Sequence, residues 1–518
     1  MATGKSTVSE IENPPSSILG ILSRLGPGLI IAGSIVGSGE LIGTTKTGAQ
    51  AGFWLLWLII IGCVIKVFVQ VELGRDALVR GKSTMDALNE VPGPKLIGKG
   101  NWLVAYWFVM WLAMTAQLGG IAGGVGQAMA ITWPLTAEGR AYNAHMDREA
   151  NAAVQLSLAK SQGVDVAAAQ QEMDSLKAAR PKPGSDEYWW TVLLSIVTSV
   201  LLVIGRYTLI QNATTTLVVA FTLVTVVTVI ALQTTATWAI GAQEFLNGLK
   251  FQFPPGDSKA SLATALKTFG IIGVGASELV AYPYWCLEKG YARFTGPHED
   301  SEAWADRARG WMRVMRWDAW CSMVVYTVAT LAFYLLGAAI LGRIGLNPSN
   351  NELIRTLNVM YEPVFGAWAK MMFLVGAFAV LYSTFFVASA GNARICADAL
   401  AVIGVADPSK KAIHRRVIIL SGIFPLLSLA LYMAIGAGPD ALVLFSGMVQ
   451  AIMLPMLAFA ALYFRYYKCD RRLAPGVAWD VCLWVTSAGM FVAAAWLLWE
   501  VTLPDVVKLI SSLSGAGK

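Results

Sequence analysis

Long apolar runs recur along the whole chain and constrain its fold more than any other feature. A run of about 20 apolar residues is long enough for a helix to cross a membrane. Charged residues make up only 14% of the chain, whereas soluble proteins hold about 25%. The sequence therefore predicts an all-α polytopic membrane protein with 11 transmembrane helices. These segments are residues 27–47, 53–73, 102–133, 189–210, 213–236, 263–288, 317–342, 366–393, 413–436, 440–464 and 478–501.

Lysine and arginine are concentrated in alternate loops. The densest clusters lie within residues 75–99, 289–316, 410–416 and 465–472. Because basic residues favour the cytoplasmic side, we expect a multi-pass protein of the plasma (inner) membrane with its N-terminus inside and its C-terminus outside. The net charge of +6 does not indicate nucleic-acid binding, because the basic residues lie in short loops between apolar segments.

The chain carries no nucleotide-binding loop and no hydrolase motif, so we expect neither an enzyme nor a pump. The six cysteines lack metal-site spacing, and we expect no cofactor beyond a possible coupling ion, Na⁺. The lipid bilayer and a small inorganic ion are the expected partners, and no obligate protein partner is evident.

The segments suggest four regions. Residues 1–25 form a cytoplasmic tail, and residues 26–236 form a first repeat of five helices. Residues 237–465 form a second repeat, and residues 466–518 hold helix 11 with an extracellular tail. A polar insertion at 134–188 reads as a pair of short amphipathic helices on the outer face. We favour a structural cap for it over a binding or gating role.

Two short stretches almost repeat each other. Residues 36–42 read VGSGELI, and residues 274–280 read VGASELV. By the predicted topology they run in opposite directions, as inverted repeats of five helices would. Glycine and serine are poor helix formers, so we expect helices 1 and 6 to be unwound in mid-membrane. Pro283 predicts a second interruption just after Glu278.

Each stretch also places a glutamate inside a membrane segment, where a carboxylate is costly and usually functional. We expect a transport site between the two breaks, although both glutamates could simply bond neighbouring helices. Lys66 and Lys46 are possible charge partners; Lys66 could pair with a glutamate or extend toward the inner surface. The candidate site residues are Gly37, Ser38, Gly39, Glu40, Gly275, Ala276, Ser277, Glu278 and Leu279.

Three further motifs resemble the Nramp family. They are GPGL at residues 26–29, TGAQAGFWLLW at 47–57 and SGMVQAIMLP at 446–455. The likeness covers roughly residues 26–465 apart from the insertion. The resemblance implies the LeuT-like fold, with helices 1 and 6 unwound at the substrate site, which agrees with the inverted repeat.

The departures from that family bear on the substrate. Where the family has Asp-Pro-Gly-Asn, with Asp and Asn binding the metal, this chain has Gly37 to Glu40. The metal-binding Met aligns with Leu279, so the soft sulfur ligand is lost. A histidine linked to proton movement aligns with Ala281, and the acidic residue of helix 3 is absent. The resemblance thus implies a divergent branch in which transition-metal selectivity is not expected.

Three substrate classes stay open for such a secondary transporter. Our first choice is a small oxyanion such as bicarbonate coupled to Na⁺, held by helix N-termini and the hydroxyls of Ser38 and Ser277. The alternative is a hard divalent cation, Mg²⁺ or Mn²⁺, held by oxygen alone from Glu40, Glu278, Ser38 and the Ala276 carbonyl. A cation-coupled symporter of a small organic solute comes third.

Overall fold

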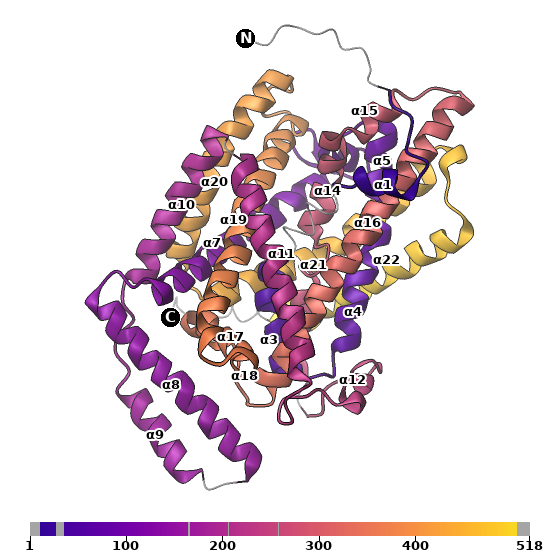
Figure 1. Cartoon of the computed structure of the whole chain (residues 1–518). Helices are drawn as coiled ribbons and strands as arrows, with labels where there is room; N and C mark the ends of the chain where they lie inside the picture. Colours follow the sequence, from indigo (N-terminus) through magenta and orange to yellow (C-terminus); the bar gives the residue numbers. More distant parts are fainter. Residues whose placement is uncertain (1–10, 27–35, 164–165, 206, 257, 505–518) are drawn as a thin grey trace, which may run out of the picture.

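A computed structural model describes residues 11–26, 36–163, 166–205, 207–256 and 258–504. Helices dominate it, and they run mostly side by side as a bundle (Figure 1). The first part of the chain forms α1 (Ile18–Ser23), η1 (Gly39–Thr44), α3 (Thr45–Ala51), α4 (Leu56–Val64), α5 (Lys66–Arg80), α6 (Thr84–Asn89), α7 (Trp102–Thr132), α8 (Ala137–Gln162), α9 (Ala167–Ala178), α10 (Asp186–Ile204), α11 (Tyr207–Leu232) and α12 (Ala242–Gly248).

Two short strands, β1 (Lys95–Ile97) and β2 (Gly100–Asn101), pair antiparallel in the first part of the chain, just before α7.

The second part of the chain adds further helices to the bundle. The longer helices are α13 (Lys259–Phe269), α14 (Ala276–Lys289), α16 (Glu302–Leu336), α19 (Ala369–Val402), α20 (Lys410–Ile435), α21 (Pro439–Tyr463) and α22 (Val477–Leu497). The five-residue α15 (Tyr291–Thr295) lies between α14 and α16 along the chain. The short ones are η2 (Gly337–Gly342), η3 (Asn350–Glu352), α17 (Leu353–Asn358), η4 (Val359–Tyr361), α18 (Glu362–Phe365), η5 (Gly366–Trp368), η6 (Phe464–Lys468), η7 (Arg471–Leu473) and η8 (Leu498–Thr502).

Eight helical stretches of the described chain are long and apolar enough to cross a membrane. They coincide with eight of the predicted segments and confirm a multi-pass membrane protein. Of the other three, residues 27–47 lie partly outside the described chain, 263–288 is split into two helices, and 213–236 contains a shorter apolar stretch, Thr216–Leu232. The total of eleven and the orientation of the termini remain predictions.

Helix α7 lies at the centre of the bundle and packs through glycine. A methyl group on Gly119 would lie 2.5 Å from the Ser428 carbonyl of α20, and one on Gly120 would lie 2.8 Å from the Pro439 carbonyl of α21. Only glycine lets the helices approach this closely. The outer helices instead present exposed apolar side chains, such as Leu223 of α11 and Val485 of α22, as expected of a surface that meets lipid.

The second break is visible in the chain path. Helix α13 ends at Phe269 and α14 begins at Ala276, so six residues between them are not helical. In the first repeat, Ser38 opens a π-helical turn, η1, that runs into α3. The predicted all-α membrane fold and the break in helix 6 are confirmed, whereas the first half of helix 1 lies outside the described residues. Pro283 does not interrupt α14, so that prediction was wrong; packed neighbours in a membrane protein tolerate one missing backbone bond.

The insertion forms a helical hairpin, as predicted, but α8 is not short, since it has 26 residues. The hairpin projects from the end of the bundle opposite α1 and α15 (Figure 1). Asn143 of α8 donates a 2.8 Å hydrogen bond to the Ala130 carbonyl, and the Tyr142 hydroxyl donates a 2.9 Å bond to Glu352. These bonds fix the base of the hairpin to α7 and η3.

Candidate ion-transport site

Glu40 is fully buried and holds the two breaks together. Its carboxylate accepts a 3.2 Å hydrogen bond from the Gly37 amide at the first break and another of 3.2 Å from the Gly273 amide at the second. The Thr330 hydroxyl of α16, which donates a 2.7 Å bond to the Tyr326 carbonyl, lies 3.4 Å from the same carboxylate. Backbone N–H groups freed by both breaks therefore converge on one side chain, which satisfies them inside the membrane.

Glu278 lies in the first turn of α14 and folds back over the start of its own helix. Its carboxylate accepts a 2.7 Å bond from the Ser277 hydroxyl. A methyl group on Gly275 would lie 2.5 Å from the Glu278 carboxylate and 3.2 Å from the Gln450 side-chain oxygen. Any side chain at position 275 would crowd the Glu278 carboxylate, so glycine is required there. A negative charge at a helix N-terminus is also electrostatically favourable.

Lys66, at the start of α5, reaches the second break. Its buried ammonium group donates a 2.8 Å hydrogen bond to the Ile272 carbonyl and a second bond to the Phe269 carbonyl. The ring of Phe269 lies 4.6 Å from the nitrogen. The structure thus shows neither of the predicted alternatives, because Lys66 bonds neither glutamate and does not extend toward the inner surface. Lys66 instead donates hydrogen bonds to backbone carbonyls that have no helical partner at the second break.

Lys46 lies elsewhere. Its ammonium group forms a buried 2.6 Å ion pair with Asp440 of α21, and Asp440 also accepts a 2.7 Å bond from the Asn350 amide. Lys46, named from the sequence as a possible charge partner, therefore pairs with Asp440 and not with either site glutamate. Glu72 and Arg75 form a buried local pair at 3.0 Å.

Two glutamines that sequence reasoning missed complete the polar cluster. Gln117 of α7 donates 3.2 Å to the Ser38 hydroxyl, and Gln450 of α21 donates 3.0 Å to the Gln117 oxygen. The Gln450 side-chain oxygen in turn accepts a 3.1 Å bond from the Ser277 amide and lies 2.9 Å from the Ser277 hydroxyl, whose proton it shares with Glu278. A continuous chain of hydroxyl and amide groups thus joins Ser38 of the first break to Ser277 of the second. An amide side chain inside an apolar segment was the signal available in the sequence.

The two glycines of the first break make room for neighbouring helices. A methyl group on Gly37 would lie 2.2 Å from the Thr384 hydroxyl of α19, and one on Gly39 would lie 3.0 Å from the Ile271 carbonyl. Ala276 and Leu279 are fully buried in the apolar core beside α14. Ala276 and Leu279 therefore bring no side-chain ligand to the cluster.

Asp318 of α16 is a second buried acid that sequence reasoning passed over. It accepts a 2.8 Å bond from the Gly26 amide and lies 3.3 Å from the Tyr282 hydroxyl of α14. It lies at the edge of a predicted segment, where a charge looks like a helix-end residue. Within the described chain, no three His, Cys, Asp or Glu side chains converge as they would at a protein metal site.

Comparison with known proteins gives a consistent result. The family model "Natural resistance-associated macrophage protein-like" (Nramp) matches residues 183–500. No curated protein matches the chain in sequence. The crystal structure of the Eremococcus coleocola manganese transporter in complex with an aromatic bis-isothiourea compound is similar, with a TM-score of 0.60 and 13% identity over 98% of this chain and 96% of that one.

Two further solved structures are similar in fold. The H236A mutant of the same manganese transporter has a TM-score of 0.58 and 13% identity over 98% of this chain and 95% of that one. MhsT in complex with L-phenylalanine has a TM-score of 0.50 and 15% identity over 93% of this chain and all of that one. At such identities the likeness establishes the fold alone. The family match covers more than half of the chain, and the chain therefore belongs to the Nramp family of membrane transporters and is not an enzyme.

Proposed function

We propose that this transporter carries a small oxyanion, with bicarbonate as the leading example, together with Na⁺. The position of Lys66 carries the proposal. Its ammonium group donates hydrogen bonds to the carbonyls of Phe269 and Ile272, which the second break leaves without helical partners. In LeuT-like transporters, unwound carbonyls serve to coordinate a transported cation. Here the Lys66 ammonium group already bonds these carbonyls, so they are not free to coordinate a cation, and the hydrogen-bond donors of the cluster favour an anion.

The remaining groups of the cluster suit an anion with several oxygens. Ser38, Ser277, Gln117 and Gln450 can all donate hydrogen bonds after a small rotation, and their present partners are mostly one another. The N-terminus of α14 adds backbone N–H groups and a favourable dipole. A planar oxyanion can exchange its water for these donors without any new charged residue.

The charge balance explains why a driving cation is needed. Glu40, Glu278 and Lys66 together leave one negative charge when all three are ionised. An entering anion is repelled by that charge unless a cation joins it. Glu278 and the side-chain oxygen of Gln450 both lie close to Gly275, and they offer oxygen ligands for Na⁺.

A divalent cation is the second candidate. The similarity to a solved manganese transporter favours it, and Glu40, Glu278, Ser38 and the Ala276 carbonyl would form an oxygen-only set suited to Mg²⁺ or Mn²⁺. Against it, the Glu40 carboxylate already accepts hydrogen bonds from the Gly37 and Gly273 amides. Metal binding would have to break these bonds.

Uptake into proteoliposomes separates the two candidates. One set of vesicles encloses a pH dye and a parallel set encloses a divalent-metal dye. The proposal predicts internal alkalinisation that requires both bicarbonate and an inward Na⁺ gradient, with no metal signal. A saturable Mn²⁺ or Mg²⁺ signal without a bicarbonate effect would replace it with the cation function.

A further inference from the structure

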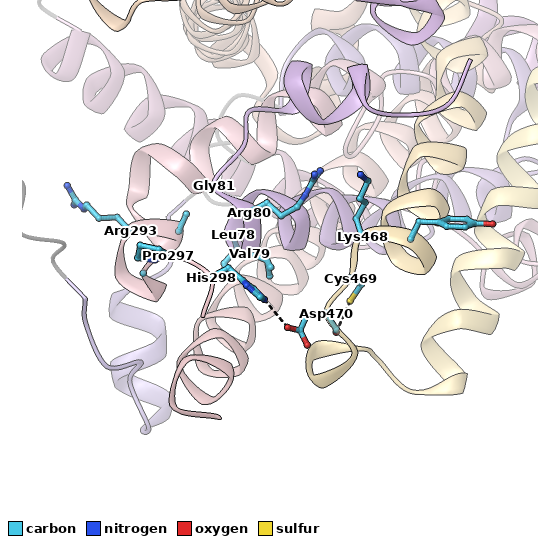
Figure 2. A pocket seen from close by; sticks show the side chains of 13 residues that line it. Leu78, Val79, Arg80, Gly81, Arg293, Pro297, His298, Lys468, Cys469 and Asp470 are labelled. Atoms are coloured by element: carbon cyan, nitrogen blue, oxygen red, sulfur yellow. Dashed lines mark hydrogen bonds and ion pairs between the residues drawn. The ribbon is translucent and has the colours of Figure 1, made fainter. Parts of the chain in front are cut away.

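A cavity at the end of α5 lies far from the helix breaks. Its volume is about 790 Å³, within the range of small-molecule sites. It opens at the C-terminal end of α5, beside α15 and the end of η6 (Figure 2). The cavity begins twelve residues beyond Lys66 on α5, which is about 18 Å along a helix. It is lined by Leu78, Val79, Arg80, Gly81, Ala292, Arg293, Gly296, Pro297, His298, Tyr467, Lys468, Cys469 and Asp470.

Positive charge exceeds negative charge in this cavity. Arg80, Arg293 and Lys468 line it, against the single carboxylate of Asp470. Asp470 is itself engaged, since it accepts a 2.8 Å bond from Arg472 and lies 3.1 Å from His298 Nε2. Figure 2 shows this His298–Asp470 contact, with Arg80 and Lys468 extending in the same direction from their own elements and Arg293 apart from them.

Arg80 and Lys468 are held in place by a shared acid. Both contact the Glu90 carboxylate, at 2.5 Å and 3.2 Å, and Lys82 bonds it as well. Arg80 also pairs with Asp76 at 2.6 Å, so three cations share two carboxylates and one positive charge remains in excess at the cavity wall. Fixed ammonium and guanidinium groups of this kind are the donors that recognise phosphate.

The surroundings of the cavity indicate a lipid source for that phosphate. Apolar side chains, among them Leu78 and Pro297, form part of the wall. Next to it, Tyr466, Tyr467 and Trp484 are exposed, and the Trp484 indole donates 3.0 Å to the Tyr466 hydroxyl. Exposed tyrosine and tryptophan at helix ends are typical of the membrane–water interface. The basic clusters predict that this interface is the cytoplasmic one, where anionic lipids attract such groups.

We propose that this cavity binds the phosphate headgroup of an anionic phospholipid, with Lys468 and Arg80 contacting the phosphate and Arg293 at the mouth. The headgroup would bridge α5, α15 and η6, and so link helices from both predicted repeats. This site is independent of the transport function proposed above.

Thermal unfolding of the full-length protein in detergent tests the proposal without any transport assay. Dioctanoyl phosphatidylglycerol should raise the unfolding midpoint in a saturable way, whereas dioctanoyl phosphatidylcholine should not. Lys468→Gln, alone and with Arg293→Gln, should raise the apparent dissociation constant about tenfold or more, because each removes a charge-assisted contact. Lys468→Gln leaves Glu90 paired with Arg80 and Lys82, so folding should survive.

The matched control removes two exposed lysines at the start of α20. Lys410→Gln with Lys411→Gln should leave the lipid effect intact. An equal loss in this control, or no loss in the cavity variants, would overturn the proposal. Equal stabilisation by inorganic phosphate or glycerol phosphate would also overturn it, by assigning the cavity to a soluble anion.

Discussion

The ammonium group of Lys66 on α5 donates a 2.8 Å hydrogen bond to the carbonyl of Ile272 in the second helix break. A buried ammonium ion must be paired or hydrogen-bonded, because burying a bare charge is very costly. The unwound chain supplies carbonyls for this purpose, and Lys66 in turn satisfies them. The break and the lysine therefore stabilise each other, and the positive charge becomes a fixed part of the site.

Replacing either site glutamate should abolish most transport. Glu40→Gln places an amide group where the Gly37 and Gly273 amides both donate, so donors face each other and the two breaks separate. Glu278→Gln removes the negative charge beside the N-terminus of α14. Initial uptake rates of purified, monodisperse variants in proteoliposomes should fall at least about tenfold, a loss of roughly 1.4 kcal/mol in transition-state stabilisation.

The control for this experiment is Glu288→Gln on the same helix. Glu288 pairs at 3.2 Å with Arg394 and is well exposed, so its replacement should leave uptake unchanged. Wild-type rates in both Glu40→Gln and Glu278→Gln would show that the two carboxylates only bond neighbouring helices.

Gln117 and Gln450 should act as a unit. Their side chains are joined by a 3.0 Å hydrogen bond, so each leucine substitution removes one hydrogen bond from the other amide. Each should raise the substrate KM, and the double variant should cost less than the sum of the singles. A double-mutant cycle on kcat/KM should give a coupling energy of about 0.5–3 kcal/mol. Strict additivity would exclude the amide chain from the site.

Gly270 should not tolerate a side chain. A methyl group there would lie 1.9 Å from the Gly447 carbonyl and 2.7 Å from the Ala451 amide of α21. Gly270→Ala must therefore push α13 away from α21, at a cost of about 1–3 kcal/mol in unfolding free energy. Gly391 of α19 has no neighbour within 4 Å, and Gly391→Ala should be neutral or stabilise by up to about 1 kcal/mol. Equal midpoints for the two variants would contradict this packing.

The ion cluster around Glu90 should make stability depend on acid pH. Partial burial disfavours its charge, but hydrogen bonds from Lys82 and Arg80 outweigh this and lower the pKa of Glu90 from 4.5 to about 2. A lowered pKa stabilises the folded state above the unfolded value, and that stabilisation is lost as the pH falls from about 4.5 toward 2. Glu90→Gln should thus be less stable than wild type near neutral pH.

The difference in unfolding midpoint between wild type and Glu90→Gln should shrink progressively below about pH 4.5. Thermal unfolding of both proteins across the acid range measures it. A constant difference between wild type and Glu90→Gln at all pH values would show that Glu90 acts through packing instead of charge.

The sequence was sufficient to predict the membrane class and the break before α14, because glycine, serine and glutamate are conspicuous inside apolar segments. It was not sufficient to predict which groups would meet. Lys66 contacts carbonyls some 200 residues away in the chain, and Lys46 pairs with Asp440 rather than with a glutamate. Such partners depend on how the helices pack. Gln117 was overlooked because a neutral amide hardly changes the hydropathy of its segment.

Replacing Lys66 tests the central claim most directly. Lys66→Gln removes the fixed positive charge, and Lys259→Gln, at an exposed lysine paired with Glu500, is the matched control. Bicarbonate-dependent and Na⁺-dependent alkalinisation of proteoliposomes would be compared among wild type and both variants. We predict that Lys66→Gln loses at least about nine-tenths of the rate, while Lys259→Gln keeps it. Undiminished alkalinisation in Lys66→Gln, or Mn²⁺ uptake by the wild type without any bicarbonate signal, would contradict the account.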